Sequence, residues 1–267
     1  MHYHNSTTAR PDSRWLSEGT KAKMVDFCLS ADLGNQHRPN VKVAQKLFCE
    51  SLGGLSVNHT SFQPLQLRPI MLSIETKKPG TDPEKAQLQM TIWHSAQWAF
   101  LREAVSVARR LRRGSREEEL GDGEARMAET GEEEDAAVRQ ILSRLPFLPG
   151  LLISGHRWSL VMSTWEDYSS SQQVDGGNDG STRSNSQSQA SNLRGADADH
   201  RVHFWKECQF GSTQTILETF EVVAGVREIA GWIVAWYLPW FKQHVLNLPS
   251  GADQHEPEPR KPVLVNG

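Results

Sequence analysis

Two adjacent segments with different periodicities constrain the fold more than any other feature of the chain. Residues 68–77 (RPIMLSIETK) form a short apolar run with the character of a strand, and the Pro79-Gly80 pair that follows indicates a turn. Residues 83–107 then carry apolar side chains at helical spacing, and Pro83 suits a first helical turn. A strand followed at once by a long helix predicts a domain that layers helices on a sheet.

Five further segments extend this pattern. We expect a strand at 23–30, a short helix at 41–52, a long strand or tight hairpin at 151–165, a partner strand at 201–210 and a second long helix at 212–236. The resulting order is β, α, β, α, β, β, α. It predicts an α/β fold with a mixed central β-sheet flanked by helices.

Four segments contain too few apolar residues to contribute to a core. We predict one domain over residues 20–248, with a disordered N-terminus at 1–19, disordered inserts at 114–136 and 169–200, and a disordered tail at 249–267. The insert at 169–200 is rich in Ser, Gln, Asn, Asp and Gly, and the tail is rich in proline.

The charge of the chain is unevenly distributed. The formal net charge is −3, but residues 117–135 contain ten acidic residues and one arginine, a local charge of −9. The rest of the chain therefore carries +6. This excludes a uniformly basic nucleic-acid binder and predicts a moderately basic body joined to an acidic insert.

Cysteine usage and hydropathy indicate the compartment. The three cysteines (Cys28, Cys49 and Cys208) are far apart and match neither a disulfide framework nor a zinc site, which favours a reducing, intracellular location in the nucleus or cytoplasm. Residues 1–20 have no apolar run, so we expect no secretory signal. The most apolar stretch, 229–241, is short and contains Pro239, so we expect no membrane partner.

The strand at 70–77 carries the most informative pair of charges. Alternation places Ile70, Leu72 and Ile74 on one face, which should be buried. Glu75 and Lys77 then share the other face, about 6.6 Å apart along the strand. A carboxylate suits a divalent metal, and an adjacent ammonium suits an attacking water or a developing negative charge. The alternative is an ion pair at the surface.

Two further residues could join this pair. Asp26 lies between Val25 and Phe27 in the apolar strand at 23–30, and if the two strands are neighbours, Asp26 and Glu75 could share one ion. The alternative is an aspartate on an edge strand that faces water. Gln89 lies in the first turns of the long helix, near the end of the strand, where it could hold a water or a phosphate oxygen. The alternative is an ordinary glutamine on the helix surface.

The order of these segments resembles the PD-(D/E)XK nuclease superfamily, in the variant that is widespread in fungal proteins. An Asp on one strand, E-x-K on the next and a helix with Gln carry the resemblance. The matching segments are 23–29 (KMVDFCL), 57–77, 86–101 (AQLQMTIWHSAQWAFL), 145–163 and 211–226. The resemblance implies a restriction-endonuclease-like core.

The resemblance also implies roles for individual residues. Asp26 and Glu75 would bind Mg²⁺ or Mn²⁺, with the Thr76 backbone carbonyl as a further ligand. Lys77 would be the catalytic lysine and Gln89 the helix glutamine. The implied partner is nucleic acid, with DNA as the expected substrate. The rival expectation is a catalytically inactive module for nucleic-acid or protein binding. The family also places an acidic residue on a helix before the Asp strand. Glu18 is a poor match to it, so we expect an N-terminally shortened version.

Other polar residues are weaker candidates. His59 and His156 could act in metal binding or acid–base chemistry, but no second ligand follows either at metal spacing. The basic cluster in the long helix could contact phosphates or act as a nuclear address. We favour the alternative that it interacts with the helix dipole and pairs with the following glutamates. The cluster comprises Arg109, Arg110, Arg112, Arg113 and Arg116.

Overall fold

The computed structural model describes residues 1–33, 39–80, 83–120, 130–167 and 200–248. The predicted tail at 249–267 lies outside the described residues. The predicted insert at 169–200 does too, apart from His200, which begins a strand.

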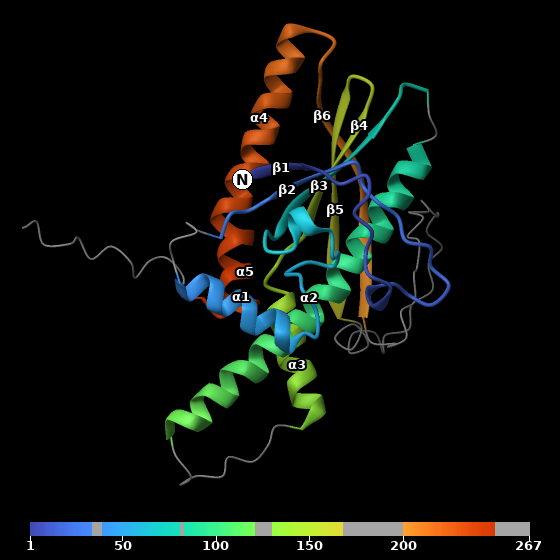
Figure 1. The fold of residues 1–267 in the computed structure, drawn as a ribbon. Helices are drawn as coiled ribbons and strands as arrows, with labels where there is room; N and C mark the ends of the chain where they lie inside the picture. Colours follow the sequence, from blue (N-terminus) through green and yellow to red (C-terminus); the bar gives the residue numbers. More distant parts are fainter. Residues whose placement is uncertain (34–38, 81–82, 121–129, 168–199, 249–267) are drawn as a thin grey trace, which may run out of the picture.

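The strands form one six-stranded sheet in the order β1-β2-β3-β4-β5-β6 (Figure 1). β3 and β4 are parallel, and the other neighbouring pairs are antiparallel. The strands are β1 (His2–Asn5), β2 (Phe27–Ser30), β3 (Ile70–Lys77), β4 (Leu148–Ser154), β5 (Arg157–Asp167) and β6 (His200–Ser212). The mixed sheet confirms the predicted fold class.

The helices flank this sheet. They are α1 (Pro39–Ser51), α2 (Pro83–Leu120), α3 (Gly131–Leu142), α4 (Ile216–Trp232) and α5 (Leu238–His244). A π-helical turn, η4 (Ile233–Tyr237), joins α4 to α5, and two 3-10 turns, η1 (Ser13–Trp15) and η2 (Gln63–Leu65), lie in the N-terminal part. Within the described part of the chain, the helices all fall short of the length and apolarity that a membrane span requires.

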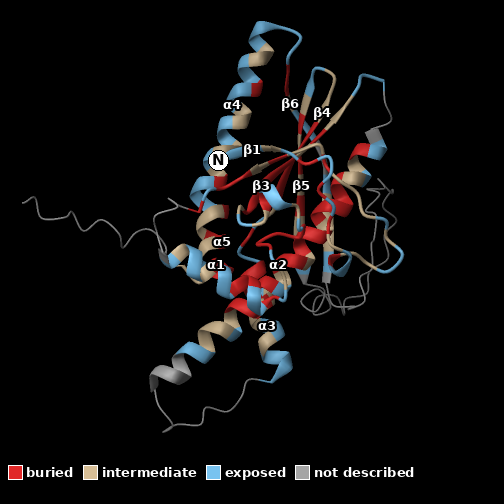
Figure 2. Ribbon diagram, in the orientation of Figure 1, coloured by how far each residue is buried: buried red, intermediate tan, exposed pale blue. Residues whose placement is uncertain are grey.

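The central strand β3 is buried on both faces. Met71, Ser73 and Glu75 are each 1% exposed, so the prediction of a single buried face is wrong. The reason is that α2 packs against the Ser73 side of the strand, where the Trp93 indole donates a hydrogen bond to the Ser73 hydroxyl. Pairing with β2 and β4 also makes β3 an interior strand. Figure 2 shows buried residues concentrated in the central strands and the middle of α2. Strands of this kind are typical of sheets covered by helices.

The predicted segment at 151–165 is two strands, so the hairpin alternative is correct. β4 and β5 meet at a turn in which Gly155 has φ 59°, a conformation that glycine adopts without strain. The partner predicted at 201–210 is β6, which pairs with β5.

The helix that follows β3 is longer than predicted. α2 continues to Leu120, and α3 begins at Gly131 after a capping box formed by Thr130 and Glu133. The prediction of a disordered insert at 114–136 is therefore wrong for both ends of that range, and residues 121–129 lie outside the described residues. In Figure 1 the far half of α2 and the start of α3 extend beyond the sheet.

The N-terminal segment belongs to the fold, so the prediction of a disordered 1–19 is wrong. β1 pairs with β2, and Tyr3 stacks on Phe27 with ring centroids 5.1 Å apart. Ala9 is fully buried, and Trp15 packs edge-on against Phe100 of α2. These contacts depend on residues far along the chain, which explains why the polar local sequence gives no sign of them.

Helix α4 packs against β6. α4 turns back from β6 after three residues and packs along it, where Gly225 lets the Phe210 ring approach the helix backbone. The predicted helix at 212–236 therefore begins at Ile216 and continues through η4 into α5. Figure 2 shows that α4 is largely exposed or half-buried, in contrast to α2.

Candidate active site at the end of strand β3

Polar side chains converge at the carboxyl end of β3, where this strand lies parallel to β4. Glu75 is opposite Leu152, and Lys77 is opposite Ser154. β4 follows β3 by way of α2 and α3, so this end of the sheet is where a β-α-β unit presents its loops. The carboxyl ends of parallel strands are the usual position of ligand sites in such sheets.

Lys77 is the centre of a short hydrogen-bond chain. Its ammonium donates to Oε1 of Glu75 at 2.5 Å and to Oε1 of Gln89 at 2.9 Å. The Gln89 amide in turn donates to the Met24 carbonyl at 3.0 Å. Gln89 therefore links α2, β3 and the segment before β2, and it fixes the position of the Lys77 ammonium.

Asp26 reaches the same end of β3 from the segment before β2. Its Oδ2 accepts hydrogen bonds from the backbone N–H of Thr76 at 2.8 Å and from the Thr76 hydroxyl at 2.6 Å. Asp26 lies just before β2, which begins at Phe27, so the predicted strand at 23–30 starts too early. The backbone carbonyls of Val25 and Asp26 accept from Ser6 of the N-terminal segment, which keeps them out of the β2–β3 ladder.

The Glu75 carboxylate is enclosed by protein. Its side chain is 0% exposed, whereas that of Lys77 is 22% exposed. Burial raises the pKa of Glu75, and the negative charge of Asp26 adds to the rise, while the Lys77 ammonium and the Asp26 backbone amide oppose it. The Asp26 carboxylate bonds to Thr76, the residue after Glu75, so the two carboxylates lie at the same end of β3.

One oxygen of Glu75 is left without a hydrogen bond. Among the described residues, Oε2 of Glu75 is buried and has no partner. A buried, unpaired carboxylate oxygen is costly, and a bound cation would remove that cost. This oxygen and the neighbouring Asp26 carboxylate fit a divalent metal.

Few side chains at this site could bind a metal ion. The described residues contain no group of three or more His, Cys, Asp or Glu side chains that could hold a metal ion. Mg²⁺ is commonly held by one or two carboxylates together with waters and substrate phosphates. Two carboxylates are therefore sufficient for an ion that also contacts substrate, but they do not form a closed structural site.

The structural alternatives considered for Glu75, Lys77, Asp26 and Gln89 in the sequence analysis do not match the structure. Glu75 and Lys77 are not a surface ion pair, because the carboxylate is buried. Asp26 does not lie on an edge strand, because β1 pairs with β2 on the outer side. Gln89 is half-buried, with its side chain bonded to Lys77 and Met24.

The two histidines noted in the sequence lie elsewhere. His59 is fully buried against Trp93, with ring centroids 4.4 Å apart. Burial lowers the pKa of His59 to about 3, with a smaller contribution from the neighbouring His94. The ring is therefore neutral near pH 7 and unsuited to acid–base chemistry there. His156 is exposed at the β4–β5 turn, where its Nδ1 lies 2.9 Å from the Thr213 hydroxyl.

The arginine cluster pairs with glutamates, as favoured from the sequence. Arg110 contacts Glu103 at 3.1 Å, and Arg113 contacts Glu134 of α3 at 3.2 Å. The cluster does not end the helix, since α2 continues to Leu120. Arg110 and Arg113 both pair with Glu134 and so tie α3 to α2.

Three contacts were not predicted from the sequence. Two lie at this site, the Thr76 hydroxyl on Asp26 and the Met24 carbonyl on Gln89, and the third is the Asn58 side chain, which orders the loop before the opposite end of β3. Asn58 is buried and bonds to the backbone of Leu65, Arg68 and Ile70.

A mixed sheet with an Asp on the approach to one strand and E-x-K at the end of the next defines a nuclease-like α/β protein. A family model for the PD-(D/E)XK nuclease superfamily matches residues 1–238, and the chain belongs to this superfamily. The match begins at the N-terminal segment, in agreement with its place in the sheet.

The search of curated proteins finds no significant match to this chain, and the search of solved structures finds none either.

Proposed function

We propose that the chain is a metal-dependent phosphodiester hydrolase that acts on nucleic acid, with DNA as the preferred substrate. The observation that carries the proposal is the convergence of Glu75, Lys77 and Gln89 beside Asp26, with one buried Glu75 oxygen unpaired. Membership of the nuclease superfamily supports the same reaction class.

The Asp26 and Glu75 carboxylates would hold Mg²⁺ or Mn²⁺, with the Thr76 carbonyl as a further ligand. When bound, the ion supplies charge stabilisation at the phosphoryl group and a lowered pKa for a coordinated water. The Thr76 N–H and hydroxyl both bond to Oδ2 of Asp26, so this carboxylate is already oriented before any ligand arrives.

Lys77 would orient the attacking water. An ammonium has three N–H donors, and two of those of Lys77 are used on Glu75 and Gln89. The third remains for a water or a phosphate oxygen. Gln89 is a positioning residue in this account, because it contacts Lys77 and the Met24 carbonyl rather than the reacting atoms.

The second candidate is a catalytically inactive nuclease-fold module that binds nucleic acid or protein. The net charge of −3 favours this candidate, because it provides weak long-range attraction to a polyanion. The two candidates differ in turnover and share the fold.

Cleavage of plasmid and single-stranded DNA in Mg²⁺ or Mn²⁺ separates the two. We expect cleavage by the wild-type chain and a loss of at least about a hundredfold in Lys77→Ala and Asp26→Asn. Lys46→Ala is the matched control, because Lys46 is exposed on α1 and pairs only weakly with Glu50 at 3.7 Å. Absence of cleavage with every divalent ion, together with retained DNA binding, would favour the inactive module.

A further inference from the structure

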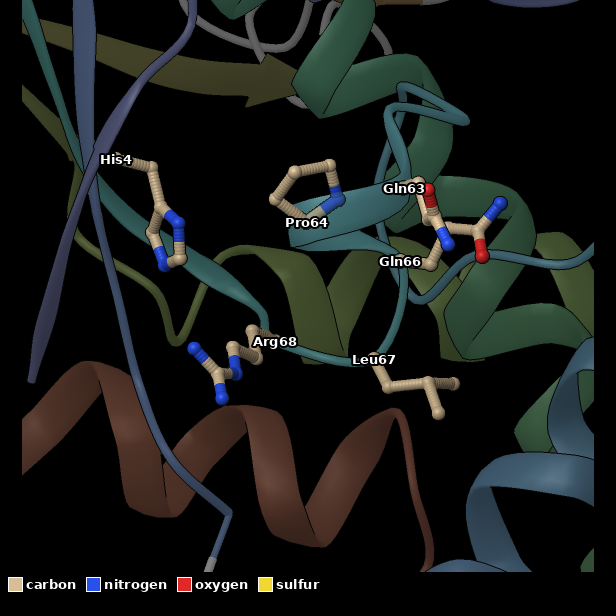
Figure 3. Close-up of a pocket in the computed structure, with 6 residues that line it drawn as sticks. All are labelled: His4, Gln63, Pro64, Gln66, Leu67 and Arg68. Carbon is tan, nitrogen blue, oxygen red and sulfur yellow. The ribbon is translucent and has the colours of Figure 1, made fainter.

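A pocket of about 480 Å³ opens at the other end of β3. It lies between β1 and the loop that leads into β3, and its lining residues are His4, Gln63, Pro64, Gln66, Leu67 and Arg68 (Figure 3). From Ile70 to Lys77, β3 spans roughly 23 Å at about 3.3 Å per residue. The pocket is therefore distinct from the candidate active site.

The side chains of Arg68 and His4 face this pocket, and neither has an acidic partner among the described residues. The half-buried Arg68 side chain has no ion pair within the described ranges of the chain. The His4 ring is held by the Ser30 hydroxyl, 2.9 Å from Nε2. In the described part of the chain, Nδ1 of His4 has no hydrogen-bond partner, so it is available to a ligand.

Arg68 and His4 are near enough to interact electrically. Burial lowers the pKa of His4, and the positive charges of Arg68 and His2 add to the effect. A bound anion would reduce the electrostatic repulsion between the Arg68 guanidinium and a protonated His4 ring.

The wall of the pocket is already ordered. Asn58 accepts from the Ile70 N–H and donates to the carbonyls of Leu65 and Arg68, while the Arg68 N–H donates to Leu65. The Gln45 side chain on α1 donates to the Leu67 carbonyl. Binding would therefore require little ordering of the backbone, which favours affinity.

We propose that this pocket binds a phosphorylated ligand, with the phosphate on the Arg68 guanidinium and the His4 imidazole. The planar fork of arginine matches phosphate oxygens in a bidentate manner. The volume lies in the range of small-molecule sites and exceeds what one inorganic anion fills. The apolar surfaces of Pro64 and Leu67 and the amide of Gln63 would contact the rest of the ligand. The phosphate could belong to a free nucleotide or to a nucleic-acid strand.

Titration of the full chain in EDTA tests this site while the metal-dependent chemistry is silent. The probes are inorganic phosphate, adenosine monophosphate, a short single-stranded oligonucleotide and succinate, followed by calorimetry and by the imidazole NMR signals of His4. We expect phosphate and the nucleotide to shift the His4 signals and succinate to bind more weakly. Tighter binding of the nucleotide than of the oligonucleotide identifies a free nucleotide as the source, and the reverse order identifies the strand.

Variants localise the binding. We expect Arg68→Gln to weaken phosphate binding at least about tenfold, because a charge-assisted pair is lost. Arg68→Lys keeps the charge but loses the planar guanidinium, so its phosphate affinity should lie between those of the wild type and Arg68→Gln. It replaces Arg68→Gln in the test if the glutamine variant folds poorly. Arg144→Gln is the matched control, because Arg144 is exposed beyond α3.

Three results would overturn the proposal. They are unchanged phosphate affinity in Arg68→Gln, an equal loss in Arg144→Gln, and succinate binding as tight as that of phosphate. Equal loss in the control would indicate diffuse attraction by surface charge rather than a site.

Discussion

The two ends of β3 carry opposite kinds of unpaired polar group. At the carboxyl end, a buried carboxylate oxygen of Glu75 has no partner, and at the amino end Arg68 faces an open pocket with no acid, both within the described part of the chain. The first group is fully desolvated, whereas the second retains contact with water. The comparison shows that polar groups at the two ends of one strand can lack partners at very different cost to folding.

The largest effect should come from the acidic end. Glu75→Gln keeps the size of the side chain but removes the charge that would hold a metal. We expect metal-dependent DNA cleavage to fall by about a thousandfold or more, whereas phosphate binding at the Arg68 pocket stays as in the wild type. Cleavage rates and calorimetry on the same preparation measure both. Full activity in Glu75→Gln would remove this residue from the site.

The next effect concerns the ion pair. Lys77→Ala leaves the buried Glu75 carboxylate without its ammonium, so we expect the free energy of unfolding to fall by about 2–3 kcal/mol near pH 8. In the double variant with Glu75→Gln, most of this loss should disappear. Urea unfolding of the four proteins gives the coupling directly. Additive losses would show that the pair is solvated rather than buried.

A smaller effect follows from the raised pKa of Glu75. Because this pKa is higher in the folded chain than in the unfolded chain, the charged carboxylate destabilises the fold at all pH values above the folded pKa. The penalty fades as the pH falls through that pKa and is absent below the ordinary glutamate value near 4.5.

Glu75→Gln should therefore melt a few degrees higher than the wild type near pH 8, with the gap closing in acid. Thermal scans from pH 4 to 8 measure the trend. A melting temperature of Glu75→Gln below that of the wild type near pH 8, with the difference closing in acid, would mean that the Lys77 pair outweighs the burial.

The smallest effect belongs to the basic end. Arg68 remains partly solvated and has no acidic partner in the described ranges, so Arg68→Gln should change the free energy of unfolding by no more than about 0.5 kcal/mol. The same change should weaken phosphate binding. A large loss of stability would instead indicate that Arg68 braces the loop through its side chain.

The local sequence was sufficient to locate β3 and the first part of α2. Alternation placed Glu75 and Lys77 on one face, and they share a hydrogen bond at 2.5 Å. Helical spacing placed Gln89 one turn into α2, from which it reaches Lys77. These arguments succeed because the period of a strand or helix is a local property of the chain.

Features that depend on distant partners were not predicted. β1 (HYHN) has no apolar pattern, and it forms because β2 offers an edge and Phe27 offers a ring for Tyr3. The charged end of α2 was interpreted as an insert, whereas Arg110 and Arg113 bind glutamates and α3 buries Leu142 beside it.

The Arg68 pocket was missed for the same reason. His4 and Arg68 are far apart in sequence, and the segment that carries His4 was assigned to the disordered part of the chain. Likewise, the burial of the unpaired Glu75 oxygen is a property of tertiary packing, which the alternation of side chains along a strand does not predict.

The central claim is that Asp26 and Glu75 share one cation at the end of β3. Titration with Mn²⁺, followed by electron paramagnetic resonance of the free ion, tests it without any substrate. The account predicts one bound ion in the wild-type chain, loss of that ion in both Asp26→Asn and Glu75→Gln, and unchanged binding in Arg68→Gln. Equal Mn²⁺ binding in the wild type and Glu75→Gln would contradict it.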